Sequence, residues 1–214
     1  MKSILIIGLG SFGRYIAGKF IENGHEVMAI DHNDYKADAA VEDISHILIG
    51  DATDERFMKG LGIDNFDLVV IAISDNFQTT LEITVILKDL GCKFIVARAS
   101  SDIHKKLLLR NGADYVSFAE KEAAERLAIS LGNDSIFDFI ELTPEIGIYE
   151  ISVPKKWIGK TVIDLNIRNK HHLNVLATKS NGKINIELGS THIFSADETI
   201  MVMGTHENVN RVEK

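Results

Sequence analysis

The sequence predicts an α/β protein, with a doubly wound parallel sheet followed by a second, smaller α+β domain. Up to residue 117, short aliphatic runs alternate with longer amphipathic segments. The runs are almost continuously apolar, which is typical of parallel strands that helices cover on both faces. From about Thr143 the runs are shorter and alternate between apolar and polar residues. We therefore expect a first domain over residues 1–142 and a small α+β domain over residues 143–214.

The strands expected in the first domain are the runs ILII, EVMAI, HILI, LVVIAI, FIVA and YVS. The helices expected between them lie at about residues 12–23, 35–41, 54–61, 76–90 and 102–111. In the fourth of these helices, Phe77, Leu81 and Val85 recur every four residues, so an apolar stripe can lie against the sheet. Asn-Gly or Leu-Gly pairs at several of the helix ends are typical of termination by a left-handed residue.

The stretch over residues 119–142 links the two expected domains. AEKEAAERLAISL, residues 119–131, is rich in strong helix formers. DSIFDFIEL, residues 134–142, carries five large apolar residues in nine. A segment this apolar at the edge of a complete sheet is expected to pack against something outside its own domain. A second copy of the chain is the simplest occupant, so we expect a homodimer.

The second domain is expected to contain strands at GIYEISV, NVLATKS, KINIEL and TIMVMG, around one helix at residues 162–170. SNGK, residues 180–183, stands between two of these strands and is typical of a tight hairpin turn. A domain of roughly 70 residues buries too little surface to be very stable alone, so we expect association to stabilise it.

Composition limits the classes of function. The 23 Lys and Arg residues against 31 Asp and Glu give a formal net charge of -8, which disfavours a nucleic-acid partner because such proteins need a basic face. The single cysteine, Cys92, cannot form an internal disulfide. The apolar runs fall far short of the roughly 20 residues of a membrane-spanning helix, and the N-terminus lacks a cleavable signal pattern. We expect a cytoplasmic protein.

Gly8, Gly10 and Gly13 form a G-x-G-x-x-G pattern between an expected strand and an expected helix. In dinucleotide-binding folds the first glycine permits a tight turn, the second lets the backbone approach a pyrophosphate, and the third lets the helix pack on the strand. Backbone N–H groups at the start of the helix then face the phosphates. The alternative is a tight turn without a ligand. The pattern and its position favour an adenine nucleotide in a Rossmann-like domain.

Acidic and polar residues follow the next strands, at the edge where the glycine turn lies. Asp31 ends the second expected strand, about 20 residues after the turn, where a carboxylate accepts the ribose hydroxyls and repels a 2′-phosphate. Asp51 follows the third strand and is expected beside the adenine, although it, Thr53 or Asp54 can instead cap the next helix. Ser74 follows the fourth strand, where it or a neighbour is expected to act as a cap.

Longer segments resemble a known family. They are GDATDERFMKGLGIDNFDLVVIAISDN, VARAS, LLLRNGADYV, AEKEAAERLA and WIGKTVIDLNIRNKHHLNVLATKSNGKI, in this order along nearly the whole chain. In order and spacing they resemble the RCK family, the regulators of potassium channels and transporters that are also called TrkA or KtrA proteins.

The resemblance implies a Rossmann domain that binds NAD(H), ATP or ADP without changing it, followed by a small ligand-sensing module. It implies a regulatory, non-enzymatic subunit that gates a membrane potassium channel or transporter. It also implies homodimers that assemble into an octameric ring, peripheral to the inner face of the cell membrane. It leaves open which nucleotide is physiological, whether the partner is of the Trk or Ktr type, and the direction of gating.

The resemblance also assigns residues to a nucleotide site. The expected cofactor-binding set is Gly8, Gly10, Ser11, Phe12, Gly13, Asp31, His32, Asn33, Asp51, Ala52, Ser74 and Arg98. Ser11 stands where the ATP-switched relatives tend to carry an arginine, which favours NAD(H) or ADP, and Arg98 has a surface ion pair as its alternative role. Glu120 falls where some relatives place a carboxylate near a divalent cation shared across the dimer. Its alternative role is a stabilising charge at a helix start.

Some relatives bind cyclic di-AMP in the C-terminal module. Val162, Ile167, Arg168 and Asn174 fall on the matching positions, as apolar contacts for the bases, a guanidinium for phosphate and an amide for a polar edge. The alternative is core packing for the two aliphatic side chains and a surface position for the other two. A His-His pair at residues 171–172 replaces the usual aromatic-glycine pair and weakens this expectation.

Two other classes of function remain as alternatives. An NAD-dependent oxidoreductase needs a proton-transfer group near the nicotinamide and commonly a substrate domain of about a hundred residues or more. A redox-sensing transcriptional regulator on the same fold needs a basic recognition helix. The short tail and the acidic charge balance favour the regulatory subunit over both.

Overall fold

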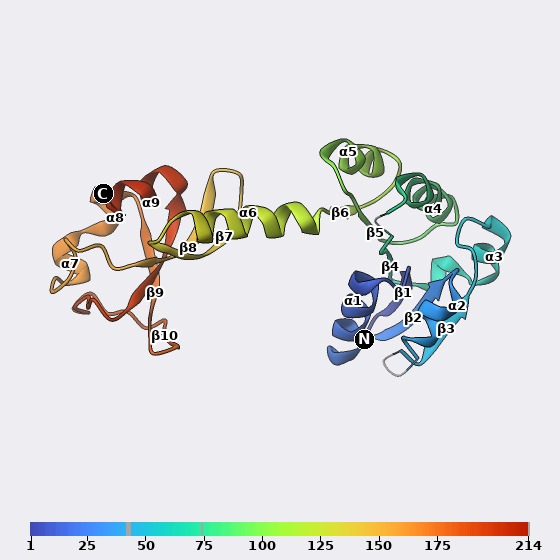
Figure 1. Cartoon of the computed structure of the whole chain (residues 1–214), viewed down its shortest axis with the longest axis horizontal. Coiled ribbons are helices and arrows are strands. Elements are labelled where there is room, and N and C mark those ends of the chain that lie inside the picture. Colours follow the sequence, from blue (N-terminus) through green and yellow to red (C-terminus); the bar gives the residue numbers. More distant parts are fainter. Residues whose placement is uncertain (42–43, 74, 214) are drawn as a thin grey trace. The chain divides into compact units, whose positions relative to one another are not determined.

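The computed structural model describes residues 1–41, 44–73 and 75–213 (Figure 1). Contacts within the chain divide it into two compact units, Met1–Glu120 and Lys121–Lys214. The first unit is built on a six-stranded sheet and the second on a five-stranded sheet. The predicted fold class, a doubly wound parallel sheet with a second α+β domain, is confirmed.

The strands of the first sheet are β1 (Ser3–Ile7), β2 (Glu26–Asp31), β3 (His46–Ile49), β4 (Leu68–Ile71), β5 (Ile95–Arg98) and β6 (Tyr115–Ser117). They are parallel and lie in the order β3-β2-β1-β4-β5-β6. The strand order runs one way from β1 to β3 and the other way from β4 to β6, so the sheet has a switch point between β1 and β4. In open α/β sheets, ligands bind at the carboxyl ends of the strands that flank such a point.

The helices of the first unit are α1 (Ser11–Glu22), α2 (Asp34–Asp38), α3 (Glu55–Gly60), α4 (Phe77–Asp89) and α5 (Asp102–Arg110), with a 3₁₀ helix, η1 (Ile63–Asn65). Figure 1 shows helices on both sides of the sheet. Helix α2 ends before the expected residue 41. It begins after Asn33, whose side chain accepts a hydrogen bond from the backbone N–H of Lys36.

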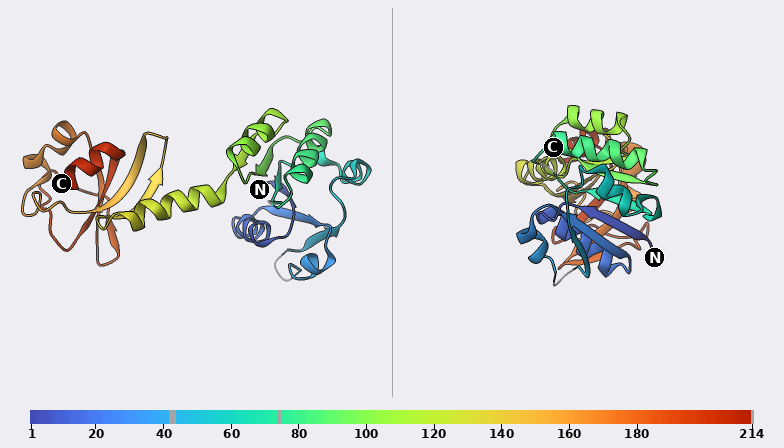
Figure 2. Two further views of the ribbon diagram at one scale, coloured as in Figure 1. Left: turned by 45° about the horizontal axis from the view of Figure 1, so that its top comes forward. Right: turned by 90° about the vertical axis from the view of Figure 1, so that its right-hand side faces the viewer.

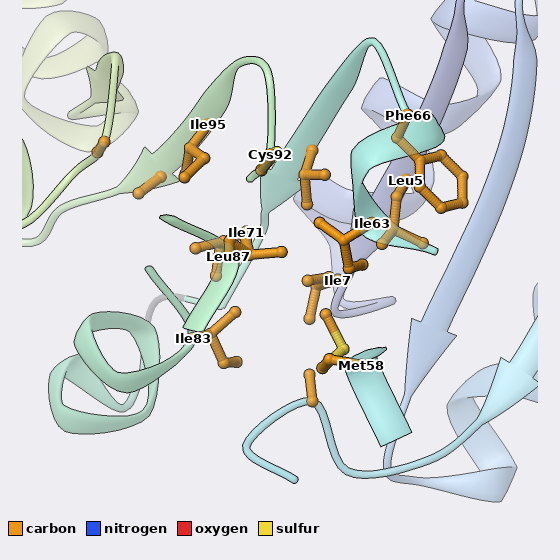
Figure 3. Close-up of a cluster of buried hydrophobic side chains, with 14 of the residues drawn as sticks. Leu5, Ile7, Met58, Ile63, Phe66, Ile71, Ile83, Leu87, Cys92 and Ile95 are labelled. Atoms are coloured by element: carbon orange, nitrogen blue, oxygen red, sulfur yellow. The ribbon is translucent and has the colours of Figure 1, made fainter. Parts of the chain in front are cut away.

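Side chains of β1 alternate between two cores. One core lies under α3, α4 and α5 and includes Leu5, Ile7, Met58, Ile83 and Leu87 (Figure 3). Leu108 of α5 belongs to the same core. The opposite core lies under α1 and α2 and includes Ile4, Ile6, Ala17 and Ala37. Because both faces of the sheet are covered, its strands have continuous apolar sequences. This packing fixes the carboxyl ends of the strands, where the loops begin.

Helix α6 (Ala119–Gly132) begins in the first unit and continues into the second. The strands of the second sheet are β7 (Ile136–Glu141), β8 (Ile146–Ser152), β9 (Asn174–Ser180), β10 (Lys183–Asn185) and β11 (Thr199–Thr205). They are antiparallel, in the order β10-β9-β11-β8-β7. The remaining helices are α7 (Val162–Leu165), α8 (Ile167–His171) and α9 (His206–Glu213). Helix α9, drawn in red in Figure 2, packs on this sheet through Val209 and Val212.

The division of the chain differs from the expected boundary after residue 142. The apolar segment 134–142 contains β7, which pairs with β8 in the second sheet. The contacts therefore divide the chain between Glu120 and Lys121. Exposed Phe137 and Ile140 on β7 still leave this edge strand with apolar surface.

Local structure in the second unit also differs from the expected elements. The helix expected over residues 162–170 is two short helices, because Asn166 between them has a left-handed backbone with φ 45°. The expected hairpin turn joins β9 and β10, with positive φ at Asn181 and Gly182. Helix α9 was not among the expected elements.

None of the helices within the described residues has the length and apolar character needed to cross a membrane. Helix α6, with 14 residues, is shorter than the roughly 20 residues of a spanning helix.

Candidate functional site

A cavity of about 810 Å³ opens at the carboxyl ends of the strands in the first unit. Its wall comes from the β1–α1 turn, the end of β2, the loops after β3 and β4, the end of β5 and the start of α6. This is the edge at which the strand order reverses, where the fold offers the loops of both halves of the sheet. The cavity lies within the size range of small-molecule and cofactor sites, roughly 300–1,000 Å³.

The glycine turn forms one wall of the cavity. Gly8 has φ +100°, which only glycine adopts readily, and its N–H donates to the carbonyl of Ile30 over 2.8 Å. Gly10 precedes α1, and a Cβ added there would meet no atom within 4 Å. Helix α1 has no side-chain cap and no acidic residue in its first turn. Its positive end therefore faces the cavity without a nearby neutralising carboxylate on the helix itself.

Gly13 does not line the cavity. A Cβ at this position would lie 1.9 Å from the carbonyl oxygen of Gly8 and 3.2 Å from the Cβ of Ala72. Glycine is therefore required for α1 to pack against β1 and β4.

Asp31 ends β2 and is 5% exposed. Its Oδ2 accepts a hydrogen bond from the backbone N–H of Leu9 over 2.6 Å, and its Oδ1 accepts one from the N–H of Asn33 over 2.9 Å. A carboxylate has about four acceptor positions, so it retains capacity for donors from the cavity. His32 lies beside it, with Nδ1 3.5 Å from Asp31 Oδ1.

Asp51 lines the cavity after β3. Its Oδ1 accepts hydrogen bonds from the N–H and the hydroxyl of Thr53, at 2.9 and 2.7 Å. These two bonds hold the pKa of the Asp51 carboxyl below its usual value. Asp54, and not Asp51, caps α3, since its side chain accepts from the N–H groups of Arg56 and Phe57. The carboxylate of Asp51 is thus charged and not occupied in helix capping.

Arg98 and Glu120 form the opposite wall. The guanidinium carbon of Arg98 lies 4.4 Å from the ring centroid of Phe12, and its Nη2 is paired with the carboxylate of Glu120. The side chain of Arg98 is only 10% exposed, whereas that of Glu120 is 60% exposed. Among the described residues, Nε of Arg98 is a buried donor with no hydrogen-bond partner. The surface ion pair considered from the sequence is therefore present, but its arginine is mostly buried.

The cavity brings together most of the residues expected at a nucleotide site. Those that line it are Gly8, Gly10, Ser11, Phe12, Asp31, His32, Asp51, Ala52, Arg98 and Glu120. Gly13 and Asn33 do not line the cavity. Gly13 allows the close packing of α1, and Asn33 caps α2. Ser74 lies outside the described residues.

Several residues of the cavity were not in the expected set. They are Ile7, Ile30, Lys36, Gly50, Thr53, Ala72, Ile73, Asp75, Asn76, Thr79 and Ile83. The aliphatic residues among them stand in or beside apolar runs, which a buried strand explains equally well without a ligand. Asn76 has a structural role as well, because its side chain caps α4 by accepting a hydrogen bond from the N–H of Thr79. Lys36 lies in the short helix α2. From the sequence alone, a lysine that lines a ligand cavity cannot be distinguished from one that is merely solvent-exposed.

The second-ligand residues lie in the second unit. Ile167 is 3% exposed and belongs to the core of that unit, and Val162 packs against the same core. Arg168 is exposed, and Asn174 is half-buried at the start of β9. The two aliphatic side chains thus contribute to core packing, the alternative considered from the sequence.

A metal centre does not arise from the described residues of this chain. No group of three or more His, Cys, Asp or Glu side chains among them is placed to hold an ion. Glu120 pairs with Arg98.

Two family models match successive parts of the chain. Residues 4–119 match the TrkA-N domain and residues 147–214 match the TrkA-C domain. The Ktr system potassium uptake protein C of Bacillus subtilis (strain 168) is 36% identical over 213 residues, covering 100% of this chain and 96% of that protein.

Two solved structures are similar in fold. The GsuK channel bound to NAD superposes with a TM-score of 0.68 at 19% identity, covering 99% of this chain and 39% of that chain, so this chain spans well under half of the channel. The Shewanella denitrificans Kef CTD in its AMP-bound form has a TM-score of 0.53 at 28% identity, covering 61% of this chain and 82% of that chain. With both domain models matched and a full-length relative above one-third identity, this chain belongs to the RCK family of TrkA- and Ktr-type potassium uptake proteins.

Proposed function

We propose that this chain is the nucleotide-sensing regulatory subunit of a potassium uptake system, and that its cavity binds NAD(H), ATP or ADP without chemical change. The observation that carries the proposal is the convergence of the glycine turn, the uncapped start of α1 and the Asp31 carboxylate on one cavity. The full-length similarity to a Ktr potassium uptake protein and the AMP-bound form of the Kef relative support it.

Each part of the nucleotide has a matching wall. The phosphates lie against the backbone N–H groups at Gly10 and the start of α1, where the helix dipole favours negative charge. The ribose hydroxyls donate to the remaining acceptor positions of Asp31. The adenine lies on the side of Asp51 and Ala52, between the loop after β3 and the end of β2.

The proposed role is a switch and includes no reaction step. A nucleotide moves a gate only through the difference between its affinities for the two conformations of the regulator. The partners are a second copy of this chain, in dimers that build an octameric ring, and a membrane potassium channel or transporter subunit; nucleic acid is not a partner. The exposed Phe137 and Ile140 on the edge strand β7 support self-association. The protein then lies in the cytoplasm, at the inner face of the membrane.

Two finer features come from the family resemblance. Cyclic di-AMP binds the C-terminal module of residues 143–214, with exposed Arg168 as its supporting contact. A divalent cation at Glu120 requires further ligands from a partner subunit, because the described residues of one chain supply no cluster of ligands.

Isothermal titration calorimetry of the purified full chain with NAD, NADH, ATP, ADP and cyclic di-AMP, with and without Mg²⁺, tests the proposal. At least one adenine nucleotide is expected to bind, and Asp31→Ala is expected to weaken binding by about 1.5–3 kcal/mol, the range for hydrogen bonds to a charged group. Gly10→Ala should also weaken nucleotide binding, because the added methyl group enters the open space beside the start of α1 where the phosphates are proposed to lie. Gly18→Ala, within α1 and away from the cavity, should leave binding unchanged.

The result that overturns the proposal is the absence of binding by every nucleotide. An assay of NADH consumption with common carbonyl compounds distinguishes the regulatory role from the alternative function, an NAD-dependent oxidoreductase. Turnover at an enzymatic rate would replace the regulatory role with that of an oxidoreductase.

A further inference from the structure

We propose that Glu120 is an internal competitor for Arg98: its carboxylate holds the guanidinium that the second phosphate of a nucleoside diphosphate binds, and so lowers the affinity of the cavity for diphosphates. This inference rests on the proposed nucleotide site. It assigns to Glu120 a role in setting affinity that differs from cation binding.

The first step is the state of the guanidinium. Arg98 pairs with Glu120 through Nη2, while its Nε is buried and has no hydrogen-bond partner among the described residues. A buried donor without a partner is costly, and an arginine presents its donors as a planar fork that matches two oxygens of one anion. The pair with Glu120 satisfies Nη2, while Nε stays buried inside the protein. A phosphate that takes the place of the Glu120 carboxylate accepts from Nη2.

The second step is the position of this fork. The guanidinium lies over the ring of Phe12, the second residue of α1, at 4.4 Å. Both side chains, with Gly10 and Glu120, line the same cavity. The fork is therefore next to the helix start that faces the first phosphate, on the side away from Asp31 and Asp51. A chain of two phosphates reaches it, whereas a nucleoside without phosphate does not.

The third step is the ease with which Glu120 leaves. Its side chain is 60% exposed, so its carboxylate regains water when the pair opens, and Arg98, 10% exposed, stays packed on Phe12. Solvent at the Glu120 end screens the pair and lowers its net contribution to stability. A phosphate can therefore displace the Glu120 carboxylate from Arg98, and the cost of this displacement should be measurable as a lower affinity for ADP. We expect that removal of the Glu120 charge raises ADP affinity about threefold to fivefold.

The cavity contains other carboxylates. The rise in ADP affinity on removal of the Glu120 charge must therefore be distinguished from the effect of making the whole cavity less negative. Asp31, Asp51 and Asp75 also line it. Two comparisons make the separation. Adenosine lacks the phosphates and should not respond, and in an Arg98→Gln background the change at Glu120 should have no effect on ADP because the shared partner is gone.

The experiment is calorimetric titration of the full chain with ADP and with adenosine, in EDTA so that divalent cations do not contribute. The variants are Glu120→Gln, Glu125→Gln, Arg98→Gln and the double variant Arg98→Gln with Glu120→Gln, each checked for folding by thermal melting. Glu125 lies on the same helix, is exposed and does not line the cavity, so it is the matched control.

The expected result is tighter ADP binding for Glu120→Gln alone, unchanged adenosine binding, weaker ADP binding for Arg98→Gln and no further change in the double variant. ADP binding that is unchanged or weakened by Glu120→Gln, or an equal gain with Arg98→Gln present, overturns the inference while leaving the nucleotide site intact. If wild-type protein binds none of the nucleotides, the proposed function itself fails, and this outcome is recognisable before any variant is compared.

Discussion

The carboxylate of Asp31 accepts a hydrogen bond from the backbone N–H of Leu9, with 2.6 Å between Oδ2 and N. This bond ties the end of β2 to the glycine turn after β1, across the two strands that form the first half of the site. The other oxygen accepts from the N–H of Asn33 at the start of α2. The sequence pattern predicts that Asp31 binds the ribose of a nucleotide. The structure shows in addition that its carboxylate holds the glycine turn through the N–H of Leu9.

We therefore predict that Asp31→Ala destabilises the turn even without nucleotide. The buried N–H of Leu9 and the partly buried N–H of Asn33 lose a charged acceptor, which should lower the local free energy of opening by about 1–3 kcal/mol. Hydrogen exchange followed by mass spectrometry measures this in peptides that contain the two amides. Asp38→Ala, exposed on α2, is the control and should change protection by less than about 0.5 kcal/mol. Wild-type protection in Asp31→Ala would show that these bonds do not hold the turn.

The two glycines of α1 should respond in opposite directions to alanine. At Gly13 the new Cβ would lie 1.9 Å from a backbone oxygen of Gly8, which the sheet holds in place. We expect Gly13→Ala to cost about 3 kcal/mol or to prevent folding, since a packed core resists insertion. At Gly18 nothing lies within 4 Å, so Gly18→Ala should gain about 0.5–1 kcal/mol from helix propensity. Urea unfolding followed by far-ultraviolet circular dichroism compares them, and equal stabilities would contradict the close approach of α1 to β1.

The features that the sequence predicts are those that depend on a repeated residue pattern or on a constraint within a few neighbouring residues. The strands of the first sheet are continuous apolar runs because both of their faces are buried. The glycine turn is recognisable because Gly8 needs a positive φ and Gly13 needs the absence of a side chain. These constraints act within a few residues, and a single sequence shows them.

The remaining features depend on contacts between distant residues. Arg98 and Glu120 are 22 positions apart, and nothing in the sequence around either one specifies the pair or the packing on Phe12. The apolar residues of segment 134–142 have the same pattern whether they contact a second copy or belong to a sheet. Its pairing with β8 required the register of the second sheet.

The break between α7 and α8 yields a prediction for the second unit. Asn166 has φ 45° and ψ 49°, a left-handed conformation that costs other L-residues about 1–2 kcal/mol. Asn166→Gly should therefore preserve or raise stability, and Asn166→Ala should lower it by about 1 kcal/mol. Both variants lose the bond from Asn169 to the Asn166 side chain, so their difference isolates the backbone. Fluorescence of Trp157, which is buried in the core of this unit, follows the unfolding. A more stable alanine variant would contradict the left-handed junction.

The last prediction concerns the pH dependence of stability and uses Cys92. Its thiol is buried in the core of the first unit, with Sγ 3.6 Å from the carbonyl oxygen of Phe94, and burial raises its pKa above the ordinary value. The folded chain therefore favours the neutral thiol, while the unfolded chain ionises it from about pH 8.5. The stabilisation is complete below this pH and is lost as the pH rises through the folded pKa.

Between about pH 8 and pH 10, the free energy of unfolding of wild-type protein should consequently fall more steeply than that of Cys92→Ala. Urea unfolding with a phosphine reductant present measures both slopes without interference from thiol oxidation. The alanine variant starts from a lower stability because it leaves a small void, but only the difference between the slopes reports on the thiol. Parallel slopes would mean that Cys92 ionises alike in the folded and unfolded chains, and the burial of this α4–β5 loop residue in the core would then be wrong.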